Sequence, residues 1–452
     1  LEYSAFFQTT GTLRTRSVLQ ASDAALPAVV HFSFNVPGSV LPEDVALVGL
    51  AIDSSGNRKT TAVQLLRVEL FGTFGRTATV VASGGSINGP SDIAFNAAGD
   101  MFIANDGDQN LVEVAHGSSA SFVFSSYNRA SRYIEVAESG DVYLTDAARI
   151  TRVSAAGSSV VNYLSLASGT TQGLSILASS VAKGTLDASA ASDGSTVTVA
   201  SQVFELDSAS DGCANGRVCV APGTTTNNAA LTAAINAQNV SVQASLDAGS
   251  GKIVLAAKSA GEAGNSLTLS TSGMVVSGAT LTQGHAEELV LGQTNDSKIY
   301  RLPETLTPTA AITANHGMFD VGGTQRGVAV SDMTTVTGLA ARNLYLYLID
   351  GQNAGNLRAY HAVDASSPNQ VFSMSSGGGQ NFGTLYDVEL VPSSSSSACL
   401  LVSDETQGKI YSVDTRDPMN TAPAVHLVAS GLSEPRGLAY HAGQLYVADR
   451  AL

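Results

Sequence analysis

The chain has 452 residues and a formal net charge of −15, with 13% charged residues and no Trp. This acidic balance disfavours nucleic acid and anionic membrane surfaces as partners. No run of about eighteen apolar residues is present, so we expect no membrane span. The length suffices for three domains with full cores, and the abundance of Ser, Thr, Gly and Ala suits a secreted β-rich protein.

Residues 1–62 form the first predicted module. Two alternating segments, 29–34 and 45–52, predict half-buried strands, and the turn residues at 53–57 predict a hairpin. The run from Val45 to Asn57 resembles the penultimate hairpin of bacterial immunoglobulin-like domains. The resemblance implies a β-sandwich-like module. Since a full sandwich takes about 100 residues, we expect Leu1 to lie inside a longer native chain.

From residue 89 on, a sequence repeat occurs six times. Each copy predicts two strands joined by a tight turn. The clearest copies are 89–105, 133–146 and 434–449, and the weaker ones are 173–178 with 288–293, 326–350 and 386–404. Each copy continues into another alternating segment and follows an apolar run, such as 78–82 or 424–428. Four strands in a unit of about 40–55 residues predict a mainly β fold, a six-bladed β-propeller.

The last copy, Glu434–Tyr440 with Gly443–Asp449, resembles the NHL-type family of β-propellers. That family pairs a "Pro-x-Gly-Ile-Ala" strand with a "Gly-x-Leu-Tyr-Val-Ala-Asp" strand. The resemblance extends over about residues 76–178 and 286–452. It implies the fold and not an activity, because the family includes binding scaffolds, lyases and lactonases.

The sixth predicted blade lacks its last strand, because the chain ends at Leu452 just after the third. Propellers close by borrowing a strand from the other end of the chain. Residues 63–70 match the pattern of 111–114 and are our candidate for this closing strand, which places the first part of the propeller at 63–178. Two alternatives stay open: 63–70 is the last strand of the N-terminal module, or the natural chain continues past Leu452.

One polar residue follows the third strand of every copy. A short polar side chain at this place can hydrogen-bond the backbone of its own turn, which predicts a structural role. A role in binding a metal or substrate is the alternative. The six residues are Asn105, Asp146, Gln293, Asp350, Asp404 and Asp449.

Residues 179–285 interrupt the third blade. The strand pattern of the repeat resumes after them, and the second part of the propeller is 286–452. The interruption falls in a hairpin loop, so its two ends must lie close together. Strands at 196–200, 202–206, 252–256 and 266–270, with a helix at 226–237, predict a small α+β domain. Its sequence resembles a module of phage tail and virion structural proteins, which implies a contact domain without catalytic residues. The equivalent loops of the next two blades, 331–342 and 392–398, are also enlarged. We therefore expect the insert and both long loops to lie on one face of the propeller.

The three cysteines point to an oxidising compartment. Cys213 and Cys219 bracket a short turn-like loop, which predicts a disulfide. A metal site there is the weaker alternative, because His285 is the only His of the insert. We expect Cys399 to be a buried thiol in a strand.

The motifs of catalysis are missing from the sequence. No two histidines have a metal-ligand spacing, and there is no nucleophile elbow or phosphate loop. Asn105, Asp106 and Asp108 are weak candidates for a Ca²⁺ loop, because the distal Glu of an EF-hand is missing. Some NHL-like enzymes hold a channel metal, but the starts of the inner strands offer a poor ligand set: Asp92, Arg132, Gln172, Arg326 and Arg436.

We therefore expect an exported, non-enzymatic structural or adhesion protein, extracellular or at the cell surface and without a cofactor. It would self-associate or bind other surface proteins or glycans. One role that fits this expectation is a subunit of an extracellular filament or layer. The competing hypothesis is a secreted propeller hydrolase or lyase with a metal in the central channel. Metal analysis of the purified protein discriminates between them.

Overall fold

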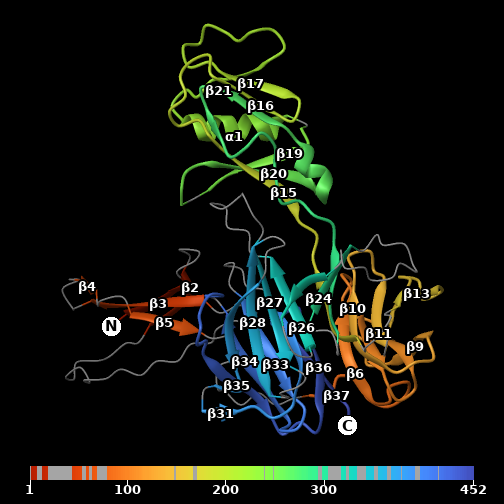
Figure 1. The fold of residues 1–452 in the computed structure, drawn as a ribbon. Coiled ribbons are helices and arrows are strands. Elements are labelled where there is room, and N and C mark those ends of the chain that lie inside the picture. Colours follow the sequence, from red (N-terminus) through yellow and green to blue (C-terminus); the bar gives the residue numbers. More distant parts are fainter. Residues whose placement is uncertain are drawn as a thin grey trace.

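The computed structural model describes five strands between residues 2 and 68, by their backbone, and most of residues 79–451. Within the second range it leaves out 147–148, 166–170, 239, 248, 294–297, 304–316, 322–324, 333–342, 351–354, 364–367, 378, 392–397 and 416. The fold is mainly β, with one α-helix among the described residues, and it contains a β-propeller (Figure 1). No helix in this part of the chain is long and apolar enough to cross a membrane.

Among the described residues, the propeller contains six antiparallel sheets, five with four strands and one with two. The first two sheets are β6 (Pro90–Phe95), β7 (Met101–Asn105), β8 (Asn110–Val114), β9 (Ser121–Ser126); and β10 (Ser131–Val136), β11 (Val142–Asp146), β12 (Arg149–Val153), β13 (Val160–Ser165). The third and fourth are β14 (Thr171–Leu177), β23 (Glu288–Gln293), β24 (Lys298–Pro303), β25 (Gly317–Asp320); and β26 (Gln325–Asp332), β27 (Asn343–Asp350), β28 (Asn356–Val363), β29 (Asn369–Met374). The last two are β32 (Leu385–Val391), β33 (Ala398–Asp404), β34 (Lys409–Thr415), β35 (Val425–Ser430); and β36 (Pro435–His441), β37 (Gln444–Asp449). A hairpin of β30 (Ser376–Gly377) and β31 (Gln380–Asn381) precedes β32.

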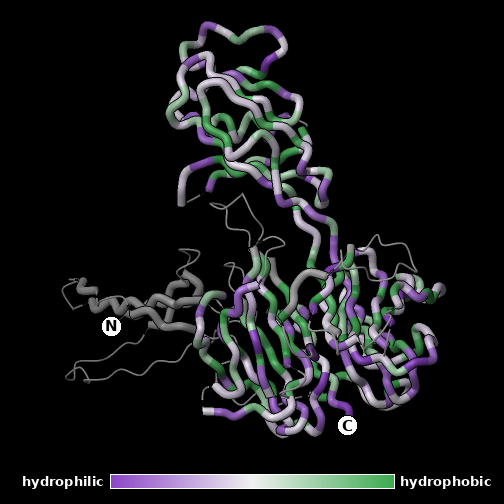
Figure 2. The backbone as a smooth tube through the Cα atoms, viewed as in Figure 1, coloured by the Kyte–Doolittle hydropathy of each residue, from purple (hydrophilic) through white to green (hydrophobic). Residues whose placement is uncertain are grey.

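The first strands of the six sheets surround a channel. Each packs beside the next in the order β6, β10, β14, β26, β32 and β36, and β36 packs against β6 to close the ring. The apolar residues that alternate along the strands fill the space between neighbouring sheets, as Ala94 and Leu111 of the first sheet do with Ile134 and Leu144 of the second. Figure 2 shows stretches of hydrophobic residues, in green, along the propeller strands. The core is therefore a series of layers between sheets, which leaves the inner strand edges facing the channel.

The prediction that residues 63–70 close the propeller is wrong, and the alternative that they belong to the N-terminal module agrees with the strand pairing. β5 (Gln64–Val68) pairs with β3 (Glu43–Ile52) in the N-terminal sheet, from Leu47↔Gln64 to Glu43↔Val68. The sheet of β36 and β37 has two strands among the described residues. The apolar run at 78–82 is no strand in its described part, although Ala82 packs against the core of the first and last sheets. Residues 64–68 have the same alternating pattern whichever sheet they join, so the sequence could not choose between the two partners.

The N-terminal module is a single five-stranded sheet as far as the structure describes it. It contains β1 (Glu2–Phe7), β2 (Leu13–Val18), β3, β4 (Arg58–Thr60) and β5. The hairpin expected at 53–57 is consistent with the pairing of β3 with β4, whereas the strand expected at 29–34 lies outside the described residues. The immunoglobulin-like identity of this module stays a prediction.

The insert projects from one face of the propeller (Figure 1). It leaves between β14 and β23, whose pairing Leu177↔Glu288 continues the blade, and an antiparallel bridge joins Ser180 to His285 where the insert begins and ends. One sheet has the strand order β19 (Val242–Leu246), β20 (Ile253–Ala260), β15 (Val181–Asp187), β22 (Val275–Val276). The other has the order β18 (Val218–Val220), β17 (Gln202–Leu206), β16 (Thr196–Val199), β21 (Leu269–Ser272).

The insert has a core of its own, built by residues between 182 and 281. The helix α1 (Asn227–Ala237) begins where expected, with the Thr226 side chain accepting a hydrogen bond from the Ala229 N–H. Leu231 and Ile235, one turn apart, are fully buried and form the inner face of this helix. A short 3₁₀-helix, η1 (Glu262–Ser266), follows β20. Of the other enlarged loops, 333–342 and 392–397 lie outside the described residues.

Candidate functional site: a carboxylate pocket in the channel

The six inner strands can be aligned residue by residue through their pairing with the second strands. In each sheet the first residue of the inner strand lies opposite the repeated polar residue, as in Pro90↔Asn105 and Leu385↔Asp404, and a bulge follows. The third residues are then Asp92, Tyr133, Gly173, Gly327, Asp387 and Gly437. The fifth residues are Ala94, Glu135, Ser175, Ala329, Glu389 and Ala439.

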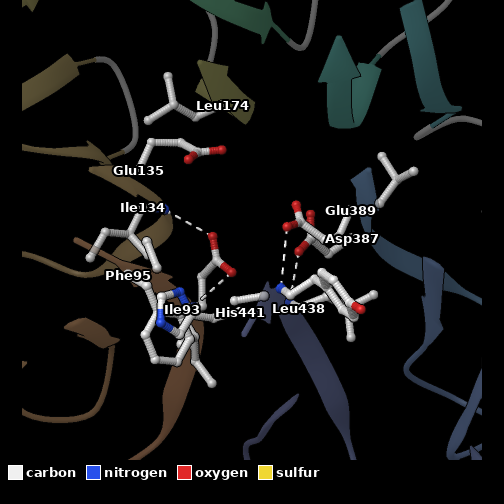
Figure 3. A pocket seen from close by; sticks show the side chains of 14 residues that line it. Ile93, Phe95, Ile134, Glu135, Leu174, Asp387, Glu389, Leu438 and His441 are labelled. Carbon is white, nitrogen blue, oxygen red and sulfur yellow. Dashed lines mark hydrogen bonds between the residues drawn. The ribbon is translucent and has the colours of Figure 1, made fainter. Parts of the chain in front are cut away.

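Four carboxylates from these two layers line one pocket of about 180 Å³ in the channel. Asp92 and Asp387 come from the third position, and Glu135 and Glu389 from the fifth (Figure 3). No Lys or Arg is among the lining residues. Phe95 and His441 also line it, with their rings stacked at a centroid distance of 4.6 Å. The inner strands end on the face that carries the insert, so the pocket lies on that side of the channel.

The two aspartates hold neighbouring blades together. Asp92 Oδ2 accepts a hydrogen bond from the Ile134 N–H of the next inner strand at 2.9 Å. Asp387 Oδ2 accepts one from the Leu438 N–H, also at 2.9 Å. Both side chains are buried, at 5% and 7% exposure. Part of the negative charge in the pocket therefore has a structural use, because it satisfies backbone donors that would otherwise be orphaned.

The two glutamates are less constrained. Glu389 Oε1 accepts a hydrogen bond from the Tyr440 N–H at 3.3 Å. The Glu135 carboxylate makes no hydrogen bond or ion pair with any described residue, and its side chain points into the pocket (Figure 3). Both residues are half-buried. A carboxylate without a partner in such a place is a ligand group open to a cation.

Burial raises the pKa values of all four groups, and repulsion by neighbouring carboxylates adds to the shift for Asp92, Glu135 and Glu389. Burial raises the pKa of Asp387 to about 6, and burial together with the Asp387 charge raises the pKa of Glu389 to about 8. The pKa of Glu135 is well above its ordinary value because of burial and the nearby Glu389. The pKa of Asp92 is raised by burial and by Asp387. A bound cation would reverse these shifts, since it favours the ionised form.

The donor set fits a hard divalent cation with water in its coordination shell. Carboxylate oxygens are the ligands that Mg²⁺ and Ca²⁺ prefer, and Mg²⁺ usually keeps several waters. Among the described residues, two groups of three side chains have ligand atoms within 4.8 Å of one another, and both lie in the insert: Asp207 with Cys213 and Cys219, and Asp193 with Asp207 and Asp211. The channel carboxylates are spaced more widely, so water has to complete the shell of any cation held there.

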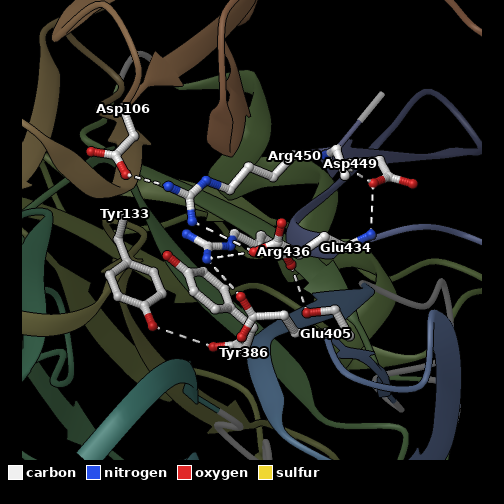
Figure 4. A network of polar contacts seen from close by, with 10 residues as sticks. Asp106, Tyr133, Tyr386, Glu405, Glu434, Arg436, Asp449 and Arg450 are labelled. Atoms are coloured by element: carbon white, nitrogen blue, oxygen red, sulfur yellow. Dashed lines mark hydrogen bonds and ion pairs between the residues drawn. The ribbon is translucent and has the colours of Figure 1, made fainter.

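A different set of side chains occupies the opposite mouth of the channel (Figure 4). Tyr386 and three arginines are the second residues of their inner strands, so they lie on the side where these strands begin. The guanidinium carbons of Arg436 and Arg326 lie 4.9 and 5.4 Å from the centroid of the Tyr386 ring. Tyr133 stacks on the other side of the channel at 5.6 Å from Tyr386. This aromatic layer separates the arginines from the carboxylates.

The repeated polar residues bind mainly the loop that enters their own inner strand. Asn105 Oδ1 accepts from the Asn88 N–H at 2.6 Å, Asp404 Oδ2 from the Gly383 N–H at 2.6 Å, and Asp449 Oδ2 from the Ser433 N–H at 2.8 Å. Asp146 and Asp350 form ion pairs with Arg129 and Arg358. The side chain of Gln293 lies outside the described residues. Two of these residues also bind their own turn as expected: Asp404 accepts from the Gln407 N–H, and Asp449 Oδ1 accepts from the Ala451 N–H at 3.4 Å.

The weak Ca²⁺ candidates each have a protein partner. Asp106 forms an ion pair with Arg450 at 3.6 Å, and Asp108 Oδ1 accepts a hydrogen bond from the Asn88 side chain at 2.7 Å. The amide nitrogen of Asn105 donates to Ser86 and Asn110. A Ca²⁺ role for this loop stays a prediction, and the loop lies away from the carboxylate pocket.

The structure contains the Cys213–Cys219 disulfide, with the two Cα atoms 5.6 Å apart. It joins the loop after β17 to β18 in the insert, where Glu205 lies opposite Cys219. Cys399 is a thiol outside this disulfide and is half-buried in β33, so the expectation of full burial was too strong.

Sequence analysis missed Glu135, Asp387 and Glu389. It compared residues from different positions of the inner strands, placing Asp92 beside Arg132, Arg326 and Arg436, although Asp92 is a third residue and the arginines are second residues. The signal was present in the spacing Asp387-x-Glu389, because residues two apart on a strand lie on the same side. What the sequence could not supply was the strand register.

Comparison with solved structures finds chains that are similar at low sequence identity. No protein-family model and no curated protein matches the chain. Virginiamycin B lyase from Staphylococcus aureus is 10% identical, with 80% of this chain and 92% of that chain covered and a TM-score of 0.38. The PQQ-bound aldose sugar dehydrogenase from Streptomyces coelicolor is 9% identical, with 82% and 90% covered and a TM-score of 0.42. A gluconolactonase from Xanthomonas campestris is 10% identical, with 80% and 84% covered and a TM-score of 0.40. All three TM-scores lie below 0.5, so these likenesses carry no conclusion about this chain.

Proposed function

We propose that the carboxylate pocket binds a divalent cation and that the protein is a cation-dependent hydrolase or lyase acting in the propeller channel. The observation that carries the proposal is the convergence of four carboxylates on one pocket without a Lys or Arg, with Glu135 lacking any described partner. This favours the hypothesis of a propeller hydrolase or lyase with a channel metal over that of a structural protein. The reason is that Glu135, Asp387 and Glu389, which the sequence analysis missed, are residues that could bind a metal.

The chain offers residues for distinct roles. Glu135 and Glu389 would hold the cation, because Glu135 has no hydrogen-bond partner among the described residues and the Glu389 hydrogen bond to the Tyr440 N–H is long, at 3.3 Å. Asp387 is suited to accept a proton from a substrate, because the Leu438 N–H fixes the orientation of its carboxylate. A bound divalent cation supplies polarisation of a carbonyl or activation of a water molecule. The pocket volume of about 180 Å³ admits only the reacting end of a substrate.

Calorimetric titration of chelator-treated protein with Ca²⁺, Mg²⁺ or Mn²⁺ tests the cation. We expect one site per chain, weakened about tenfold or more in E135Q and E389Q because each change removes a charged ligand. E262Q, a change at an exposed residue of the insert, is the matched control. Lack of binding by the wild-type protein, or variants that bind as it does, would contradict the proposal.

A panel of lactones and esters tests the reaction. We expect turnover that requires the added cation and is lost in D387N, while D387N retains cation binding. Retained binding shows that the variant is folded at the pocket. If cation binding is present but no substrate of these classes is turned over at any pH between 5 and 9, the hydrolase proposal fails and the cation proposal stands.

A second candidate function is supported by the insert. Its separate core and its projection from one propeller face suit a contact domain of an exported surface protein that binds itself, other proteins or glycans. Light scattering on the full chain and on variants lacking 1–62 or 180–284 tests it. We expect self-association that is lost in one or both deletions. Monomers in all three samples at high concentration would exclude assembly through these modules.

A further inference from the structure

The mouth of the channel opposite the carboxylate pocket gathers positive charge. Arg132, Arg326 and Arg436 are the second residues of β10, β26 and β36, and all three act electrostatically on the hydroxyl of Tyr386. Arg436 is held by Glu405 at 2.6 Å and by Glu434 at 2.8 Å. Glu434 in turn contacts Arg450 at 3.5 Å (Figure 4).

Two of these arginines have no counter-charge. Among the described residues, Arg132 and Arg326 form no ion pair, and Arg132 is exposed at the mouth while Arg326 is half-buried over the Tyr386 ring. Glu405 and Glu434 are already paired with Arg436. An uncompensated guanidinium beside an aromatic face is suited to bind an oxyanion, because it offers paired donors in a fixed plane.

Two buried donors at the same place lack an acceptor. The Tyr386 hydroxyl and the Nε of Arg436 make no hydrogen bond within the described part of the chain, although Tyr386 is only 3% exposed. Leaving a buried donor unsatisfied costs about 1–3 kcal/mol, so such groups are expected to meet a partner in the functional state. Both donors lie within the arginine cluster, which is where an oxyanion would accept from them.

We infer that this mouth is a binding site for a small molecule bearing a carboxylate or phosphate group. Arg132 and Arg326 supply the charge, and Tyr386 supplies a hydrogen-bond donor. The site lies on the far side of the Tyr133–Tyr386 layer from the carboxylate pocket. It shares no side chain with the cation site proposed above, so either proposal can fail without the other.

Calorimetric titration of the cation-free full chain with succinate and, separately, inorganic phosphate tests the site. We expect one of the two to bind at one site per chain, and the one that binds identifies the chemical class. Because a charged hydrogen bond is lost, R326Q and R132Q should weaken binding by about tenfold to a hundredfold. R217Q, at an insert arginine paired with Glu205, is the control and should bind as the wild-type protein does.

The variant Y386F separates a binding role from a structural one. Removal of an unsatisfied hydroxyl should leave the unliganded protein as stable as wild type or more stable, while anion binding weakens by at least fivefold. A structural role would instead lower the melting temperature without ligand. Lack of binding by both anions, or equal binding by R326Q, R132Q and wild type, would overturn the inference.

Discussion

The Tyr133 hydroxyl donates a hydrogen bond to the Tyr386 carbonyl oxygen, 3.3 Å away, and the two rings stack at a centroid distance of 5.6 Å. The residues belong to β10 and β32, which are not neighbours in the ring of inner strands. The pair therefore braces the channel from one side to the other. It also divides an acidic compartment from a basic one.

Replacing Tyr133 with Ala should remove this brace. Because the side chain is only 1% exposed, we expect a loss of about 3–5 kcal/mol in the free energy of unfolding, measured by denaturant titration. Y133F should lose only about 1 kcal/mol, the share of one hydrogen bond. F122A, at a residue that is 47% exposed, is the control. An equal loss of stability in F122A would show that Tyr133 does not brace the channel.

Gly437 lies where two inner strands approach closely. A Cβ atom at this position would collide with the backbone and carboxylate of Asp92 on β6, so the strands would have to separate. We expect G437A to lower the free energy of unfolding by about 2–3 kcal/mol. G249A should be tolerated, because a Cβ there would meet only the Asp247 carboxylate at 3.7 Å. Comparable thermal denaturation of the two variants would refute the close approach.

The stability of the protein should depend on pH through the titration of the Glu389 carboxyl group. Its pKa is about 8 in the folded protein, against an ordinary value of 4.5. Below pH 4.5 the group is protonated in both states. Between these values the folded protein holds a proton that the unfolded chain releases, so the stability of the cation-free protein falls as the pH rises from about 4.5 to about 8.

E389Q removes this titration. We expect the variant to lose less stability than wild type between pH 5 and pH 8, by about 1–3 kcal/mol at the upper end. Melting curves at a series of pH values measure it, and E262Q should follow wild type. An unchanged slope in E389Q would mean that the carboxylate does not carry the shift.

Deletion of 180–284, with the ends joined by a short Gly-Ser turn, should leave a folded propeller. The ends already meet, since the Ser180 N–H donates to the His285 carbonyl at 3.0 Å and the His285 N–H donates back at 3.2 Å. The core of the insert uses none of the propeller residues. Cooperative thermal unfolding of the deletion variant is the expected result, and a broad non-cooperative transition would contradict it.

Intact-mass measurement after thiol labelling should find one labelled thiol without reduction and three after reduction under denaturing conditions. Cys213 and Cys219 are bonded, and Cys399 is a thiol. Because the disulfide lies in the insert, C213S with C219S should lower the melting temperature of the insert and leave that of the propeller unchanged. More than one label on the unreduced denatured protein would exclude the disulfide.

The sequence by itself determined the repeated units and the site of the insertion. Alternating strands and a turn at a fixed place in each copy specify the blades, because these signals are local. The helix of the insert, with Leu231 and Ile235 buried, and the resumption of the third blade at Glu288 were predictable for the same reason.

Only the tertiary structure decided how the strands pair and what the channel contains. The pattern of 64–68 fits either sheet, and its pairing with β3 depends on contacts between distant residues. Glu135 and Glu389 lie 254 positions apart (389 − 135) and share a pocket because the ring closes. Their raised pKa values arise from burial and from neighbouring carboxylates, Glu389 acting on Glu135 and Asp387 acting on Glu389, which no local pattern contains.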